Sequence, residues 1–227
     1  MSDVSESRRI RGYVDGFNLY KGALQRKPRF KWLDVAALCD QIAGASVERV
    51  AYCTAPLIAL PDDPDIVSRQ QFYLRALRGN PRIDIHLGKF VRRTPRLYRI
   101  PDDGCRCCDS RMNQAPCVCC KSRTTRVVRF EEKGSDVQLG VQLVHDAHLK
   151  RMDTAVVISN DSDLQPAIDI ALYLGVDVVV ASPHPKGKSL TGSSRGFISN
   201  TRLRASQMPS PTLDADGRNV FRPSRWQ

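Results

Sequence analysis

Four aspartates lie at the ends of apolar runs or at the start of a helical stretch, where their carboxylates could together bind a metal ion. Asp15 directly follows the apolar run IRGYV, and Asp161 and Asp163 follow the run AVVIS. Asp136 opens a helical stretch within EEKGSD. Carboxylates packed together repel one another unless a divalent cation neutralises them. Because hard oxygen ligands at an open site suit Mg²⁺ or Mn²⁺, these residues predict a site for one of those ions.

An ion of this kind orients and deprotonates a water for in-line attack on a phosphodiester. Each aspartate taken alone has a plainer interpretation, because Asp is favoured in turns and at helix N-caps. Their joint placement at predicted strand and helix ends favours the metal site.

The elements that must position these residues alternate between short β-rich runs and helical stretches. We expect strands at 10–14, 47–54, 83–87, 127–130, 155–159 and 176–181, and helices at 17–25, 33–42, 63–79, 135–149 and 163–174. Such alternation is typical of βαβ units. It predicts an α/β fold with a doubly wound, mostly parallel sheet and helices on both faces.

Ligands of open α/β sheets bind beyond the carboxyl ends of the strands. If the strands at 10–14 and 155–159 are neighbours, Asp15, Asp161 and Asp163 meet at one edge of the sheet. Asp136 then reaches the same place from the start of its helix.

The charge of the chain is unevenly placed. Its formal net charge is +11, yet residues 130–182 carry 9 Asp and Glu against 3 Lys and Arg. Residues 89–129 carry 11 Lys and Arg against 3 Asp and Glu. Acidic groups beside basic arms suggest carboxylates that hold a metal while Lys and Arg collect a polyanion. The competing interpretation is a basic surface with a solvated acidic face.

Six of the eight cysteines lie in the run CRCCDSRMNQAPCVCC, within a basic segment at 91–126 that we interpret as an insertion. Two CxxC elements are formed there by Cys105 and Cys108, and by Cys117 and Cys120. Paired CxxC elements are typical of a structural zinc site. Cys107 and Cys119 leave other ligand registers open, and a thiol-rich loop without metal is the alternative.

Zinc at the insertion would fold a basic arm that grips a phosphate backbone beside the active site. Its arginines include Arg92, Arg93 and Arg96, and Tyr98 could stack on a base. Residues 206–227 contain three prolines and are interpreted as a tail that lies over the domain or is left mobile, with Trp226 as a clamp.

The chain has 227 residues and 41% hydrophobic residues, which suffices for a core. It contains no apolar stretch near the roughly 20 residues that cross a bilayer, and no signal-peptide pattern at its start. We therefore expect a cytoplasmic protein without membrane contact.

Several segments together resemble the NYN branch of the PIN-like nuclease superfamily, and most closely a bacterial NYN-type protein. They are YVDGFNLY, HLGKF, EEKGSDVQLG, VVISNDSDLQPAI and ASPHPK, and the resemblance runs from about residue 10 to the end except for the cysteine-rich insert. It implies a PIN-like domain at 10–205, interrupted by the insertion at 91–126 and followed by the tail at 206–227.

The resemblance implies a metal-dependent ribonuclease that hydrolyses RNA phosphodiester bonds. Asp15, Asp136, Asp161 and Asp163 would hold catalytic Mg²⁺ or Mn²⁺. Asn18 and Ser159 would position phosphate or a metal-bound water, and Lys133 would lie near the substrate backbone. The expected partner is RNA, with DNA as a second polyanion, and a homodimer is among the expected assemblies because PIN-like domains often pair.

The chain departs from the family pattern at one place, which leaves the four main carboxylates intact. Family members often place an Asp before an aromatic residue near the end, whereas this chain has Arg195 and Gly196 ahead of Phe197. The alternative function is a non-catalytic RNA- or DNA-binding module with a degenerate metal site, whose zinc arm is the working part.

Overall fold

A computed structural model describes residues 8–59, 63–98, 124–184 and 190–227. The chain forms two compact units, one made of residues 1–89 and 133–227 and the other of residues 90–132. Among the described helices, none is both long and apolar enough to cross a membrane.

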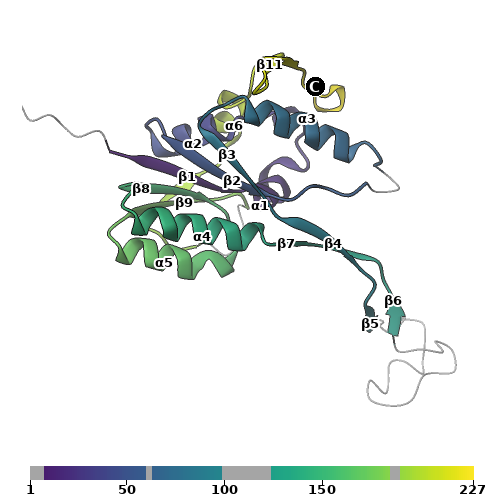
Figure 1. Cartoon of the computed structure of the whole chain (residues 1–227), viewed down its shortest axis with the longest axis horizontal. Coiled ribbons are helices and arrows are strands. Elements are labelled where there is room, and N and C mark those ends of the chain that lie inside the picture. Colours follow the sequence, from purple (N-terminus) through teal and green to yellow (C-terminus); the bar gives the residue numbers. More distant parts are fainter. Residues whose placement is uncertain (1–7, 60–62, 99–123, 185–189) are drawn as a thin grey trace, which may run out of the picture. The chain divides into compact units, whose positions relative to one another are not determined.

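The first unit is built on a six-stranded sheet whose order is β10-β9-β8-β1-β2-β3 (Figure 1). Its strands are β1 (Ile10–Asp15), β2 (Arg49–Thr54), β3 (Ile83–Leu87), β8 (Thr154–Ile158), β9 (Asp177–Ser182) and β10 (Ser194–Phe197). Every neighbouring pair is parallel. The α/β prediction of a parallel sheet flanked by helices is confirmed, and the arrangement is consistent with a PIN-like fold.

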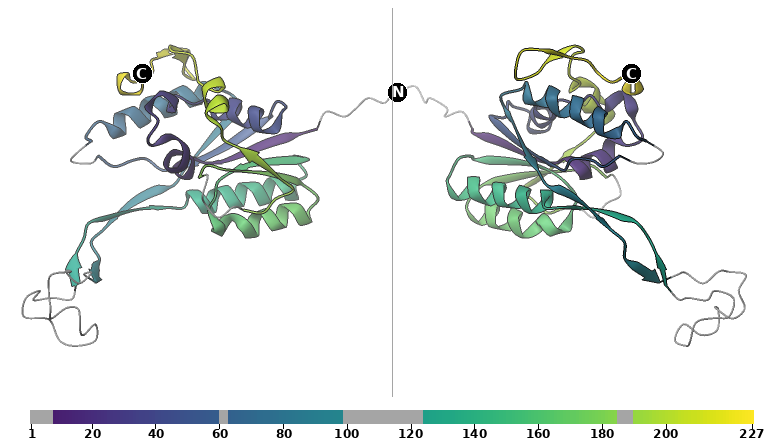
Figure 2. Two further views of the ribbon diagram at one scale, coloured as in Figure 1. Left: turned by 180° about the vertical axis from the view of Figure 1, so that it is seen from behind. Right: turned by 45° about the vertical axis from the view of Figure 1, so that its right-hand side comes forward.

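Helices cover both faces of the sheet (Figures 1 and 2). One face carries α2 (Val35–Ala43), α3 (Ile66–Arg78) and α6 (Asn200–Ala205), and the other carries α4 (Ser135–His148) and α5 (Gln165–Tyr173). The strands supply both layers by alternation: Val14 packs with the first set and Tyr13 with the second. Both side chains are almost fully buried.

Local signals explain where α2 begins and ends. The Asp34 side chain caps its start by accepting the N–H groups of Ala36 and Ala37 at 2.9 and 3.1 Å. The helix ends at Ala43, and the next residue, Gly44, has a φ of 71° in the left-handed region that glycine adopts without a Cβ penalty.

Some predicted elements differ from the observed ones. The helix expected at 17–25 is the short α1 (Gly16–Leu19) continued by a π-helical turn, η1 (Tyr20–Leu24). The strand expected at 127–130 has the wrong bounds, because Val127 and Val128 lie between two strands, β6 (Thr124–Arg126) and β7 (Arg129–Lys133). Neither of these strands joins the six-stranded sheet. The sequence does not predict the edge strand β10, since its residues SRGF lack an apolar run.

The C-terminal segment packs on the first unit. It contains the β11 (Thr212–Leu213) and β12 (Asn219–Val220) pair and ends in η4 (Ser224–Trp226). The Trp226 ring lies 6.4 Å from the Trp32 ring and 6.1 Å from the Tyr73 ring, between centroids. Trp32 Nε1 also donates to the Pro209 carbonyl at 2.9 Å. The tail thus lies over the domain, with Trp226 as its clamp.

The second unit contains two strand pairs. Strand β4 (Lys89–Arg93) pairs with β7, and β5 (Arg96–Tyr98) runs antiparallel to β6. Glu131 forms ion pairs of 3.6 Å with both Arg93 and Arg129. The cysteine-rich run lies outside the described residues, so the predicted zinc ligands Cys105, Cys108, Cys117 and Cys120 are not placed.

Candidate functional site

The order of the strands creates a switch point between β1 and β8. From β1 the chain proceeds through β2 to β3 on one side, and later from β8 through β9 to β10 on the other. In such sheets the ligand crevice lies at this point, beyond the carboxyl ends of the strands. The register pairs Val14 with Ile158, which sets the next residues, Asp15 and Ser159, side by side.

Asp15 is a buried carboxylate held by hydrogen bonds from two sides. Only 6% of its surface is exposed. Its Oδ1 accepts the Asn18 backbone N–H at 2.9 Å, which caps α1, and its Oδ2 accepts the Ser159 hydroxyl at 3.1 Å. Both of these donors are neutral groups, so they orient the carboxylate without cancelling its charge.

Ser159 joins the aspartates of the two strand ends. The residue is fully buried, and its Oγ also accepts the Asp161 backbone N–H at 3.1 Å. Asp161 Oδ1 in turn accepts the Asp163 N–H at 3.1 Å and caps the 3₁₀ helix η3 (Ser162–Leu164). A continuous set of hydrogen bonds therefore runs from Asp15 through Ser159 to Asp161 and Asp163. The cap role considered for Asp15 is real. Asp161, rather than Asp163, caps η3, and α4 begins after Gly134 without a side-chain cap from Asp136.

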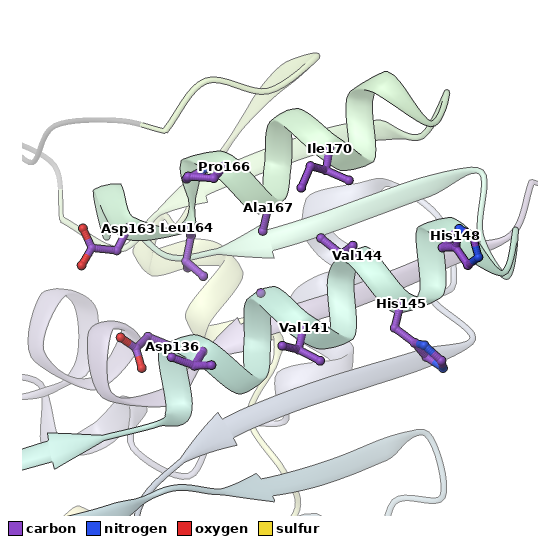
Figure 3. A pocket seen from close by; sticks show the side chains of 12 residues that line it. Asp136, Val141, Val144, His145, His148, Asp163, Leu164, Pro166, Ala167 and Ile170 are labelled. Carbon is purple, nitrogen blue, oxygen red and sulfur yellow. The ribbon is translucent and has the colours of Figure 1, made fainter.

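Asp136 lies in the first turn of α4, after Gly134, whose φ is 92°. This residue and Asp163 line the same groove between α4 and α5. Both side chains stand at the same end of that groove in Figure 3. The structure thus relates Asp136 to Asp163 through a shared cavity.

The acidic side chains of the site are not arranged as a complete set of metal ligands. Within the described ranges there is no group of three or more His, Cys, Asp or Glu residues placed to hold a metal ion. The chemistry of the donors nevertheless fits a hard cation, because Asp15, Asp136, Asp161 and Asp163 offer carboxylate oxygens and Ser159 a hydroxyl.

The other predicted site residues fall in two places. Asn18 lies in α1 and contacts Asp15 through its backbone, and the exposed Lys133 ends β7, two residues before α4. Arg92, Arg93 and Arg96 lie on β4 and β5 of the second unit and are exposed.

Tyr52 is a residue that sequence reasoning missed. A Cβ on Gly16 would lie 2.7 Å from the Tyr52 hydroxyl oxygen, so the turn after Asp15 requires glycine to admit this ring. Burial raises the pKa of Tyr52 above its ordinary range; a hydrogen bond with Thr54 opposes the rise and the nearby Asp15 charge adds to it. In the sequence, the glycine directly after Asp15 at a strand end was the available signal that another group approaches the backbone there.

A comparison with protein families relates the second half of the chain to a known domain. The NYN domain model matches residues 106–203. The resemblance to NYN-domain proteins is confirmed over this range. It includes Asp136, Asp161 and Asp163, whereas Asp15 lies before the matched residues. The match is consistent with an NYN-domain protein of the PIN-like superfamily, a nuclease-like family.

Two known proteins are similar to the chain. It is 28% identical over 235 residues to 6-hydroxy-3-succinoylpyridine 3-monooxygenase HspA of Pseudomonas putida (strain DSM 28022 / S16), covering 90% of this chain and 72% of that protein. A solved structure of a protein of unknown function from Vibrio parahaemolyticus shares 16% identity, with a TM-score of 0.46 over 88% of this chain and 97% of that chain.

Proposed function

We propose that the protein is a metal-dependent endoribonuclease whose site lies at the β1–β8 switch point. The observation that carries this proposal is the Ser159 hydroxyl, which bonds to Asp15 and to the backbone of Asp161 at adjacent strand ends. A fully buried hydroxyl that ties two acidic strand ends together is a positioning device for carboxylates. The NYN match supports the same activity.

The carboxylates of Asp15, Asp136, Asp161 and Asp163 would hold Mg²⁺ or Mn²⁺. Such an ion, when bound, activates a water and stabilises the charge that develops on a phosphate. Ser159 and Asn18 keep the Asp15 carboxylate in one orientation through the hydrogen bonds described above. The exposed ammonium group of Lys133 would attract the RNA backbone to the start of α4.

The basic strand pairs of the second unit would contribute to substrate binding. Arg92 and Arg96 present exposed guanidinium groups for phosphate, and Arg93 does so beside Glu131. Tyr98 is 83% exposed on the same unit and offers a ring for base stacking. In this proposal structural Zn²⁺, held by the four cysteines at 105, 108, 117 and 120, stabilises the arm.

The nuclease activity is tested by incubating single-stranded and structured RNA with the protein and Mn²⁺. We expect cleavage by the parent and a loss of about 100-fold or more in the Asp161→Asn variant, beyond the 10- to 100-fold typical of outer-shell changes. Asp169→Asn is the matched control, because Asp169 is exposed on α5 and bonds to Gln165. Equal cleavage by the parent and Asp161→Asn would contradict the proposal, and RNA binding without cleavage would favour the non-catalytic binding module.

One observation favours a second candidate function. The similarity to the Pseudomonas putida monooxygenase extends over 90% of the chain. By analogy the chain would transfer one atom of O₂ to a hydroxypyridine substrate. The other oxygen atom would leave as water, with two electrons and a proton from a reduced nicotinamide and a second proton from solvent. Conversion of 6-hydroxy-3-succinoylpyridine in the presence of NADH and O₂, without RNA cleavage, would establish this function in place of the nuclease.

A further inference from the structure

The groove between α4 and α5 is apolar along most of its length. Its volume is about 680 Å³, within the range of clefts that bind small molecules. Val137, Val141 and Ile170 line it with 63%, 57% and 45% of their surfaces exposed. Exposed apolar side chains gathered in one hollow of a charged protein mark a binding surface.

The groove leads directly away from the candidate site. Asp136 and Asp163 stand at one end, and His145 and His148 stand at the other (Figure 3). Asp136 and His148 are twelve positions apart in α4, which corresponds to roughly 18 Å along the helix axis. Stacked nucleotides repeat every ~3.4 Å along a strand, so this length accommodates a short single strand.

The charged residues that line the groove indicate which part of a ligand it can bind. None of the described residues that line it is Lys or Arg. A phosphate inside the hollow would meet no lysine or arginine side chain from those residues and only His145 and His148 at the far end, whereas a planar, apolar face would find valine, isoleucine and alanine side chains. Phosphates therefore belong at the acidic end with its divalent ion, and uncharged rings belong in the hollow.

We propose that the α4–α5 groove binds the bases of single-stranded RNA beside the scissile phosphate. This inference rests on the proposed nuclease function. Sequence-tolerant recognition of single strands uses the faces of unstacked bases. An RNA is favoured over a second copy of this chain because an occupant of the groove touches Asp136 and Asp163, and a second protein molecule there would cover the reaction centre.

Gly140 lines the groove, so a larger side chain at this position can block it. A Cβ at this position would lie 3.5 Å from Ala167 Cβ and 3.7 Å from Leu164 Cδ2, which are ordinary contacts. Gly140→Ala is therefore sterically accepted and favours the helix. The longer side chain of Gly140→Leu must extend into the groove and compete with an occupant.

The test is a double-mutant cycle between the protein and the RNA. Affinity for a labelled oligoribonucleotide is measured in the Asp161→Asn background, with and without Gly140→Leu. The oligonucleotide carries an abasic ribose at each position in turn. We expect Gly140→Leu and an abasic ribose at one position each to weaken binding about tenfold through the loss of apolar contact. The two changes together should weaken binding no more than either change alone. Gly140→Ala is the folding control.

The outcomes separate the rival interpretations. Additive losses at every position would overturn the groove assignment, as would a parent dimer that Gly140→Leu converts to a monomer in sedimentation. Val141→Gln, at an exposed helical position, repeats the cycle if Gly140→Leu does not fold. Cleavage by the parent without coupling contradicts the groove alone, whereas coupling without cleavage contradicts the nuclease proposal alone.

Discussion

The Ser159 hydroxyl donates to Asp15 across the junction of β8 and β1, at 3.1 Å between Oγ and Oδ2. The same oxygen accepts the Asp161 N–H, also at 3.1 Å. One buried side chain therefore sets the relative position of two acidic residues that are 146 positions apart in the sequence. The ends of two parallel strands become a single site through this contact.

Replacing Ser159 with alanine should impair both stability and activity. The change leaves the Asp15 Oδ2 atom without this donor, at a cost of about 1–3 kcal/mol in the free energy of unfolding. RNA cleavage should fall about 10- to 100-fold, as for other groups that orient metal-binding residues. Urea unfolding and initial cleavage rates measure the two effects.

Ser206→Ala is the matched control for that prediction. Ser206 is equally buried, but its Oγ has no hydrogen-bond partner among the described residues. Its replacement should leave stability and cleavage near those of the parent. Equal effects of the two substitutions would show that Ser159 is an ordinary core serine.

Stability should decrease in acid because of Asp146. Burial opposes ionisation of this carboxyl, but hydrogen bonds from Tyr13 at 2.8 Å and Arg11 at 3.0 Å outweigh it and lower the pKa of Asp146. A carboxyl with a lowered folded-state pKa stabilises the fold above its ordinary pKa. That contribution is lost as the pH falls through the ordinary value towards the lowered one.

Asp146→Asn should therefore cost about 3 kcal/mol near pH 7 and progressively less below about pH 4. Urea unfolding across this range provides the measurement. Asp216→Asn, at an exposed ion pair of 3.6 Å with Arg218, should change stability little at any pH. A penalty for Asp146→Asn that stays constant with pH would contradict the assignment.

Removal of the C-terminal clamp should destabilise the first unit. Trp226 is 9% exposed and packs against Trp32 and Tyr73, so Trp226→Ala should cost about 3 kcal/mol. Phe221→Ala lies in the same segment at a residue that is 63% exposed, and should stay within about 0.5 kcal/mol of the parent. Thermal unfolding compares the two, and similar midpoints would show that the clamp is not structural.

The arginines of β4 and β5 should contribute an electrostatic part of RNA binding. Arg92→Ala and Arg96→Ala should each remove one guanidinium–phosphate interaction and so reduce the slope of log affinity against log salt by about 0.7 for a single strand. Fluorescence anisotropy at several salt concentrations measures this slope. Arg204→Ala, at an exposed position on α6, should leave it unchanged; an equal change there would indicate a nonspecific effect of charge.

Much of the fold follows from patterns that depend on neighbouring residues alone. The run AVVIS is buried on both faces and formed β8, and Asp34 and Gly44 mark the two ends of α2. The edge strand β10 escaped prediction because its short polar sequence pairs with β9 only in the finished sheet. Tertiary pairing decides such strands, and a local pattern does not contain it.

The candidate site also has a part that the sequence predicts and a part that only the structure reveals. Asp15, Asp161 and Asp163 were predictable as strand-end carboxylates, because a parallel sheet brings the ends of its strands to one edge. The contact of Tyr52 with Gly16 depends on which side chains of β2 face α1, so only the three-dimensional structure reveals it. The link between Asp136 and Asp163 likewise arises from the packing of α4 on α5.

Calorimetric titration of Mn²⁺ into the parent protein, Asp161→Asn and Asp169→Asn tests the metal site most directly. We expect the parent and Asp169→Asn to bind the ion and Asp161→Asn to bind it about 100-fold or more weakly, a larger change than is typical of an outer-shell group. Equal Mn²⁺ affinity in all three proteins, or no binding by the parent, would contradict a metal centre at the β1–β8 switch point.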